Sequence, residues 1–157
     1  YWSNIQGTPL TIVRLFYATE LRYGIIHDLA WKVFSNEPID LSMGFVNQIW
    51  QGDANAYLCR LFSLSNSPGT IVNLTGKEVL SIRNLAQQIG EVLDINPLFV
   101  NSESKDALLG DASYLFGSMG EPCVPIEDIV RWVAEWIGNN GNTLGKPTKY
   151  ESRNGNF

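Results

Sequence analysis

Two segments of the chain each place an apolar, β-branched strand ahead of an amphipathic helix, and this repeated order limits the folds available to it. Residues 10–17 (LTIVRLFY) are apolar at most positions, which is typical of a strand covered on both faces. Residues 70–76 (TIVNLTG) form a second strand and a glycine turn. A helix over residues 82–93, capped by Ser81, follows with its apolar residues at helical spacing. This order predicts an α/β fold.

The rest of the chain predicts further short elements. Helices are expected over residues 25–34, 54–62, 111–118 and 125–137, and short strands within residues 39–44, 45–50 and 98–100. Asp53 is a candidate N-cap, and the helix after it is expected to bury Ala54, Leu58, Leu61 and Phe62 on one face. The helical tryptophans Trp31, Trp132 and Trp136 are expected to lie in the core.

The periodic pattern ends near residue 141, which divides the chain into two parts. Residues 1–141 are predicted to form one domain, and residues 142–157 an extended tail that is either mobile or draped on the body. The tail holds little that could fill a core. The chain opens with YWSNIQGTP, which reads as the end of a helix running into a turn, so Tyr1 is not expected to be the natural beginning.

Composition excludes several classes of site. The formal charge of -5 gives no bulk attraction for nucleic acid or anionic lipid, although a local basic pocket stays open. The single histidine, His27, rules out a zinc site built on paired histidines, and no metal site is expected. Cys59 and Cys123 are expected to be free, buried thiols in a reducing, cytoplasmic compartment, with a disulfide as the alternative. No membrane span or signal-peptide pattern is present.

Four segments, in this order, resemble the C-terminal, substrate-binding half of extended short-chain dehydrogenases/reductases, the NAD-dependent epimerase/dehydratase family. They are TIVRLFYATELRYG, IWQGDANAYLCRLF, VNLTGKEVLSIRNLAQQIGEVL and PIEDIVRWVAEWI. The resemblance implies a partial Rossmann-like, doubly wound architecture: its C-terminal strands and helices plus the small substrate-binding subdomain. It also implies a parent enzyme that uses NAD or NADP and acts on a sugar or nucleotide sugar as an epimerase, dehydratase or reductase.

The chain lacks the parts of that family that carry the chemistry. It has no glycine-rich dinucleotide loop and no tyrosine-x-x-x-lysine pair, since Ile5 stands four positions after Tyr1. No catalytic residue is therefore assigned, and no cofactor is expected to be held by this chain alone. The fragment is expected to be inactive by itself.

The resemblance assigns candidate binding residues by position. Tyr17 and Ala18 follow the first strand and are expected beside the nicotinamide, while Arg22, Tyr23 and Gly24 are expected beside the substrate. Asn47 and Trp50, in the GFVNQIWQGD stretch, are further candidate substrate residues. The sequence departs from the family pattern at two places. Phe16 or Tyr17 replaces an expected asparagine, and no arginine occurs in GFVNQIWQGD, which leaves a smaller sugar or sugar acid open as the substrate.

Each polar candidate also has a plain structural interpretation. Arg14 suits a structural ion pair in a buried strand, and Arg22 is as well suited to solvent as to a phosphate or carboxylate. His27 is expected on the surface or in a capping role. The alternative functional hypotheses are a non-catalytic ligand-binding or subunit-contact module of the same ancestry, and an unrelated α/β binding domain. Exposed sheet edges predict a homo-oligomer.

Overall fold

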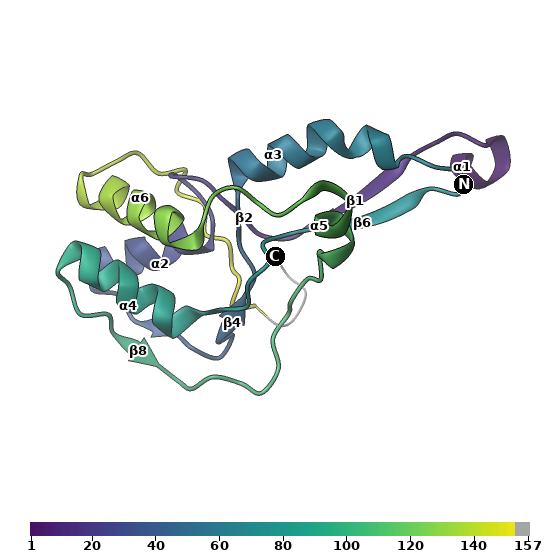
Figure 1. The fold of residues 1–157 in the computed structure, drawn as a ribbon. Coiled ribbons are helices and arrows are strands. Elements are labelled where there is room, and N and C mark those ends of the chain that lie inside the picture. Colours follow the sequence, from purple (N-terminus) through teal and green to yellow (C-terminus); the bar gives the residue numbers. More distant parts are fainter. Residues whose placement is uncertain (153–157) are drawn as a thin grey trace.

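The computed structural model describes residues 1–152, and strands and helices alternate along them as predicted (Figure 1). The helices are α1 (Trp2–Gln6), α2 (Ile25–Phe34), α3 (Gln51–Arg60), the 3-10 turn η1 (Leu61–Leu64), α4 (Ile82–Leu93), α5 (Ser113–Met119) and α6 (Ile126–Gly138). The strands are β1 (Thr11–Leu15), β2 (Ala18–Thr19), β3 (Ile39–Asp40), β4 (Phe45–Val46), β5 (Ile49–Trp50), β6 (Thr70–Leu74), β7 (Leu80–Ser81) and β8 (Phe99–Val100).

The strands pair two by two, and most of the pairs are parallel. β1 and β6 run parallel over five residues, with Thr11 opposite Thr70 and Leu15 opposite Leu74. The short pairs β2–β5 and β3–β8 are also parallel, whereas β4 and β7 are antiparallel. Parallel strands need long crossover connections, and here the crossovers carry the helices. The predicted α/β class is thereby confirmed.

Two hydrophobic cores lie on either side of the strands. The larger core lies among α2, α4 and α6, which pack against one another (Figure 1) and bury residues such as Ile25, Ile89 and Val133. The smaller core joins α3, α5 and β6. In it the Tyr57 hydroxyl donates to the carbonyl of Gly120 at 2.7 Å, and burial raises the pKa of this phenol to about 12. The chain forms one lobe from which an arm extends, and α1 lies at the end of this arm (Figure 1).

Local sequence explains where the two best-formed helices begin. The Ser81 side chain accepts a hydrogen bond from the backbone N–H of Asn84, so Ser81 is the N-cap of α4, as predicted. The apolar residues of α4, which include Ile82, Leu85 and Ile89, recur at helical spacing and are buried. Pro125 is the N-cap residue of α6, at the position expected from the sequence.

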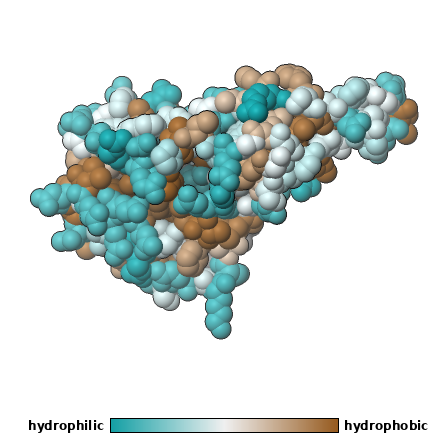
Figure 2. Space-filling model, in the orientation of Figure 1, coloured by the Kyte–Doolittle hydropathy of each residue, from teal (hydrophilic) through white to brown (hydrophobic). Residues whose placement is uncertain are grey.

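The arm departs from the prediction because β1 is covered on one face only. Arg14 is exposed and so needs no buried ion pair, and Ile12 is 49% exposed. Its register partner on β6, Ile71, is also 49% exposed. Within residues 1–152 no layer covers this face, so an apolar strand pattern here does not mean two buried faces. Hydrophobic residues likewise reach the surface at the tip of the arm (Figure 2), and Ile5 on α1 is 67% exposed.

The helix α3 begins earlier than predicted. Trp50 stands at its N-cap position, and Asp53 lies inside the first turn, where its Oδ2 accepts from the backbone N–H of Val124 at 2.9 Å. Asp53 is therefore not the N-cap. The buried stripe runs through Ala54, Tyr57 and Leu61, which leaves Leu58 40% exposed and Phe62 84% exposed. Phe62 lies in η1, where three residues per turn rotate it off that stripe.

Four more side chains lie where the sequence did not place them. His27 is buried at 6% exposure, contrary to the predicted surface role, while Trp31, four residues along the same helix, is 43% exposed rather than in the core. Cys59 and Cys123 are free thiols as expected, yet both are exposed. None of the helices in residues 1–152 is long and apolar enough to cross a membrane.

The tail packs against α2. Thr148 donates from both its backbone N–H and its hydroxyl to Asp28 Oδ2, each at 2.7 Å, and Glu151 pairs with Lys32 at 2.6 Å. Tyr150 is 2% exposed and belongs to the larger core. The prediction that the tail holds little to fill a core is wrong at this residue. Residues 153–157 of the predicted tail lie outside the described part of the chain.

Tyr150→Ala is expected to lower the free energy of unfolding by about 3 kcal/mol, because it removes a large buried ring from the core between the tail and α2. Leu144→Ala, in the same tail but 53% exposed, is the matched control and is expected to change stability by less than about 0.5 kcal/mol. Urea titration of both variants measures the difference. Equal stability of the two variants would mean that the tail does not close the core in solution.

Candidate functional site

The predicted binding residues follow the carboxyl end of β1. The chain leaves β1 through Phe16, whose N–H donates to the carbonyl of Leu74 at 3.0 Å, and Tyr17, whose carbonyl accepts from Ile49 N–H at 3.2 Å. It then enters β2, which carries Ala18. These bonds bring the carboxyl ends of β1 and β6 together with Ile49, the first residue of β5. In open parallel sheets, ligands bind in the crevice beyond the carboxyl ends of the strands.

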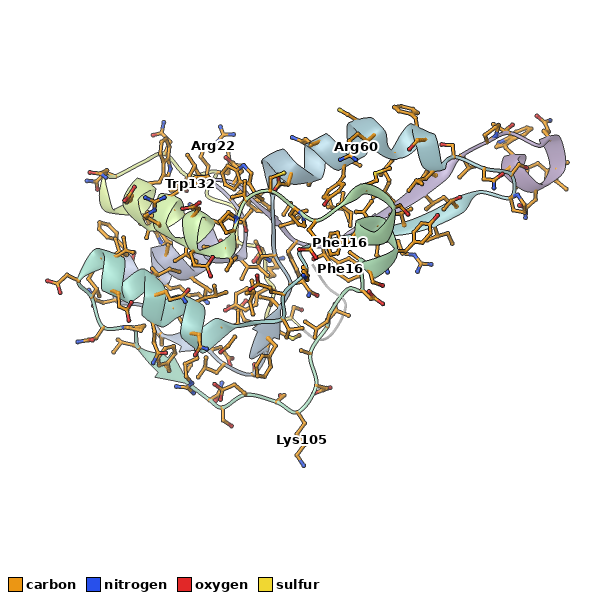
Figure 3. The ribbon with its side chains drawn as sticks, in the orientation of Figure 1. Phe16, Arg22, Arg60, Lys105, Phe116 and Trp132 are labelled. Atoms are coloured by element: carbon orange, nitrogen blue, oxygen red, sulfur yellow. The ribbon has the colours of Figure 1, made fainter. Side chains whose placement is uncertain are left out.

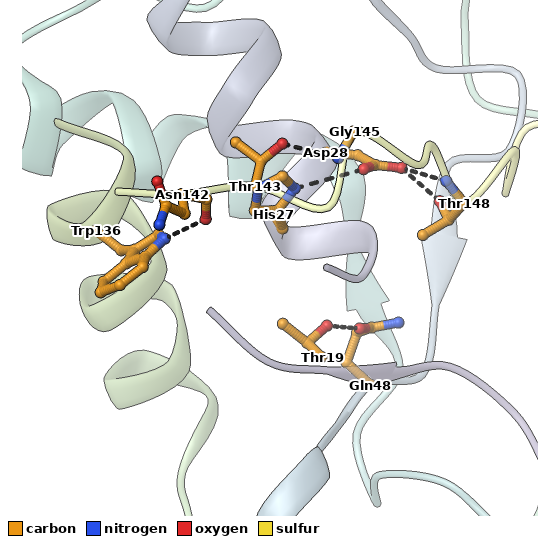
Figure 4. Close-up of polar contacts among 9 residues, drawn as sticks. All are labelled: Thr19, His27, Asp28, Gln48, Trp136, Asn142, Thr143, Gly145 and Thr148. Atoms are coloured by element: carbon orange, nitrogen blue, oxygen red, sulfur yellow. Dashed lines mark hydrogen bonds and ion pairs between the residues drawn. The ribbon is translucent and has the colours of Figure 1, made fainter. Parts of the chain in front are cut away.

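A buried polar cluster, which we call the strand-end cluster, consists of Thr19, Gln48, Thr75 and Gly76. The Thr19 hydroxyl hydrogen-bonds to Gln48 Oε1 (Figure 4), and Gln48 Nε2 donates to the carbonyl of Asn47 at 3.0 Å. The Thr75 hydroxyl is buried and has no hydrogen-bond partner in the described part of the chain. A Cβ added at Gly76 would overlap the carbonyl oxygen of Gln48. The turn after β6 therefore presses its backbone directly on the β4–β5 connection.

The sequence did not point to Thr19, Gln48 or Thr75 as site residues. Gly76 lies in the predicted glycine turn, but nothing in the pattern indicated which backbone it approaches. The three polar residues sit in short segments with no periodicity of their own. Only the pairing of β2 with β5, across about thirty residues, brings Thr19 to Gln48.

Asn47 lies in this region but is committed to backbone groups. Its Nδ2 donates to the carbonyl of Glu78 at 3.1 Å, and its Oδ1 accepts from the N–H of Gly110 at 2.7 Å. The residue is 5% exposed. Both hydrogen bonds run to segments far away in the sequence. In this geometry Asn47 holds two loops at the site.

The loop before α2 places Arg22 and Gly24 differently. Arg22 lies at the outer edge of the molecule, 52% exposed (Figure 3), and its Nε donates to both carboxylate oxygens of Glu20 at 3.1 and 3.2 Å. Gly24 has φ 122°, and a Cβ there would lie 2.7 Å from the Cα of Thr19. Only glycine fits this close approach. Gly24 therefore shapes the loop, while Arg22 is held by an exposed ion pair.

The tyrosines of this loop lie close enough to influence each other. Burial raises the pKa of Tyr17 above its ordinary value, and the ionised forms of the neighbouring Tyr23 and Glu151 raise it further because they repel the Tyr17 phenolate. Tyr17 is thus held in its neutral form, which can donate a hydrogen bond. The Leu144 N–H donates to the carbonyl of Arg22 at 3.2 Å, so the tail also touches this loop.

Trp50 stands at the wall of a second part of the region. Its ring meets that of Trp132 edge to face, with centroids 5.5 Å apart. On one side it lines a hollow formed by residues 76–80 and 121–126. Lys77 and Glu121 pair at 2.6 Å across that hollow, and both are more than half exposed. The structure therefore places Trp50 at the wall of this hollow, beside a pair of opposite charges.

Four of the described helices, α2, α3, α4 and α6, begin with acidic or capping side chains. Phosphate binds at a helix N-terminus whose N–H groups face no competing negative charge. The first turns of α2, α3 and α6 instead carry Asp28, Asp53, and Glu127 with Asp128. In α4 the Ser81 side chain already accepts from Asn84 N–H. Within residues 1–152 no group of three or more His, Cys, Asp and Glu side chains could hold a metal ion.

Comparison with known proteins finds similarity at the level of the fold. The chain matches a UDP-galactose 4-epimerase with 19% identity and a TM-score of 0.64, covering 88% of this chain and 48% of that one. It matches a UDP-glucuronic acid 4-epimerase from Bacillus cereus in complex with NAD at 17% identity and a TM-score of 0.67, covering 85% and 46%. It also matches RMD from Pseudomonas aeruginosa complexed with NADPH, with 13% identity and a TM-score of 0.68. This match covers 88% of this chain and 52% of that one.

No protein-family model and no curated protein matches the chain. The chain spans about half the length of the solved structures that it resembles. Its mixed α/β fold with small parallel sheets corresponds to part of their Rossmann-like architecture, as the resemblance implied. At these identities the likeness establishes the fold and not the chemistry.

Gly76→Ala is expected to destabilise the chain by about 1–3 kcal/mol, because the new methyl group would overlap the Gln48 carbonyl and force the strand-end cluster apart. Gly117→Ala is the matched control, since nothing lies within 4 Å of its Cβ and it sits in α5. Replacing that helical glycine is expected to stabilise by about 0.5–1 kcal/mol. Thermal unfolding of both variants compares them, and an unchanged Gly76→Ala midpoint would contradict the close backbone approach.

Proposed function

We propose that this chain is the substrate-binding portion of an NAD- or NADP-dependent enzyme of the extended short-chain dehydrogenase/reductase family. The intact parent would epimerise, dehydrate or reduce a sugar or nucleotide sugar. The observation that carries this proposal is the match over 85–88% of the chain to UDP-sugar 4-epimerases, in the element order that the sequence indicated. The carboxyl ends of the parallel strands β1 and β6, which lie beside Tyr17 and the strand-end cluster, support it.

In this proposal each residue has a binding or positioning role. Tyr17 and Ala18 form the wall beside the nicotinamide, which would supply hydride chemistry when bound. Tyr17 is held neutral by burial and by nearby negative charge, so it serves as a hydrogen-bond donor. Arg22 and Tyr23 face the substrate, and Arg22 exchanges its Glu20 partner for a substrate anion, since a guanidinium binds either in the same planar geometry.

Other residues shape the site. Gly24 lets the loop turn tightly against Thr19, and Asn47 fixes the loops at Glu78 and Gly110. Trp50 supplies an aromatic wall. The pyrophosphate of the cofactor and the acid/base pair belong to other parts of the parent, so the chain alone is proposed to be inactive. The parent is proposed to work in the cytoplasm.

A second candidate function is a non-catalytic ligand-binding or subunit-contact module of the same ancestry. Two observations favour it. Arg22 is already paired with Glu20, and both polar ends of Asn47 are occupied by backbone groups. A site whose polar side chains are satisfied internally has less to offer a substrate.

The activity of the full-length parent distinguishes the enzymatic function from the non-catalytic module. In the presence of NAD, the parent is expected to turn over UDP-galactose, UDP-glucuronic acid or both. The 157-residue chain alone is expected to turn over neither sugar. In the parent, Arg22→Ala is expected to raise KM by about tenfold through the loss of one charged hydrogen bond. Arg131→Ala, an equally exposed arginine paired with Asp128, is expected to leave KM unchanged.

Turnover by the isolated chain would overturn the proposed division of labour. Tight binding of a UDP-sugar by the parent without any turnover would establish the non-catalytic module instead. An equal effect of Arg22→Ala and Arg131→Ala would remove Arg22 from the site.

The chain is further proposed to self-associate through the uncovered face of β1 and β6. Sedimentation velocity is expected to show an oligomer that the double variant Ile12→Thr/Ile71→Thr shifts to monomer, because these paired residues are each 49% exposed on that face. Ile5→Thr, 67% exposed on α1, is the control and is expected to leave the oligomer intact. A monomer for the unmodified chain at high concentration would contradict the proposal.

A further inference from the structure

A hollow lies between α2 and the tail, apart from the strand-end cluster. We call it the tail hollow: His27, Asp28 and Trp31 line it from α2, and Lys146 and Pro147 line it from the tail. None of these residues belongs to the strand-end cluster. Figure 4 shows that the tail residues Thr143, Gly145 and Thr148 pass close to His27 and Asp28. The tail therefore forms one wall of a binding-sized space over the helix.

His27 is the unusual group in this hollow. Its side chain is 8% exposed, and neither ring nitrogen has a hydrogen-bond partner in the described residues. The nearest charged atom, Asp28 Oδ1, lies 3.7 Å from Nδ1, which is beyond hydrogen-bond length. Buried polar side chains in native structures are nearly always hydrogen-bonded. A neutral imidazole offers one donor and one acceptor, so the missing partner must be able to satisfy both kinds of group.

Trp31 provides an apolar wall in the same hollow. It follows His27 by four residues, so the two side chains lie on the same face of α2. The ring is 43% exposed, unlike Trp132 and Trp136, which are partly buried. Pro147 lines the same hollow from the tail side. An indole beside a proline gives a flat apolar surface that suits the carbon–hydrogen face of a ring.

The charges around the hollow nearly cancel. Lys32 is paired with Glu151, and Asp28 Oδ2 accepts twice from Thr148. Lys146 and Glu37 carry opposite charges, and neither forms an ion pair within residues 1–152. An anion would be repelled by Asp28 and Glu37, and a cation would be repelled by Lys32 and Lys146. The balance favours a ligand without net charge.

We propose that the tail hollow binds a neutral, hydroxyl-rich ring of pyranose size, with its carbon–hydrogen face on Trp31 and its hydroxyls on His27 and Asp28 Oδ1. Each hydroxyl can both donate and accept, which matches the imidazole and the free carboxylate oxygen. The ring nitrogens are buried, so the ligand reaches them by shifting tail residues 143–147. This site is independent of the proposed enzymatic function, since it shares no residue with that site.

Because His27 is the only histidine, its ring gives a unique NMR signal. Titration of the isotope-labelled 157-residue chain with methyl β-D-glucopyranoside is expected to shift the His27 ring and Trp31 indole signals saturably. Trp31→Ala and His27→Asn are each expected to weaken binding by about tenfold. Trp2→Ala, 59% exposed on α1, is the matched tryptophan control and is expected to leave binding unchanged.

Three results would overturn the proposal. The first is the absence of any saturable shift at His27. The second is an equal response in Trp31→Ala and in the unmodified chain, which would place the sugar elsewhere. The third is a response to inorganic phosphate or methylammonium at lower concentration than to the glucoside, which would make the site one for ions. Because Trp31 is partly exposed, Trp31→Ala is expected to fold. It therefore tests the proposal even if His27→Asn fails to fold.

Discussion

The packing of α2 against α4 and α6 is the contact on which the positions of both sites depend. These three helices make the larger core, and its fully buried residues include Ile25, Leu29 and Ile89. The loop from Tyr17 to Gly24 is held at one end by β1 and at the other by α2. Because cores are close-packed, a shift of α2 would move this loop and the tail together.

The strand ends are held mainly by hydrogen bonds and by close backbone contact. Gly76 lies against the Gln48 carbonyl, Gly24 lies against Thr19, and Asn47 joins two loops. Each of these contacts leaves little room for a side chain or for movement. Rigid positioning of this kind is what a binding site needs, and it accounts for two glycines that are not required by any helix or strand.

The tail links the two regions of the molecule. It closes the core with Tyr150, binds Asp28 through Thr148, and meets the candidate substrate loop where Leu144 N–H donates to the Arg22 carbonyl. A segment with little hydrophobic patterning thus takes part in the core, in the tail hollow and beside the loop before α2.

The sequence by itself determined the strands and helices with strong periodicity, the Ser81 cap and the α/β class, because these depend on neighbours within one or two turns. It also put Tyr17 and Ala18 directly after the first strand and Gly24 directly before the next helix, where the structure has them. Only the tertiary structure determined which residues from distant parts of the sequence contact one another. His27 is buried by the tail, Arg14 and Ile12 are exposed for want of a covering layer, and Thr19 meets Gln48 through a strand pair. Such contacts join residues tens of positions apart, and no local pattern specifies them.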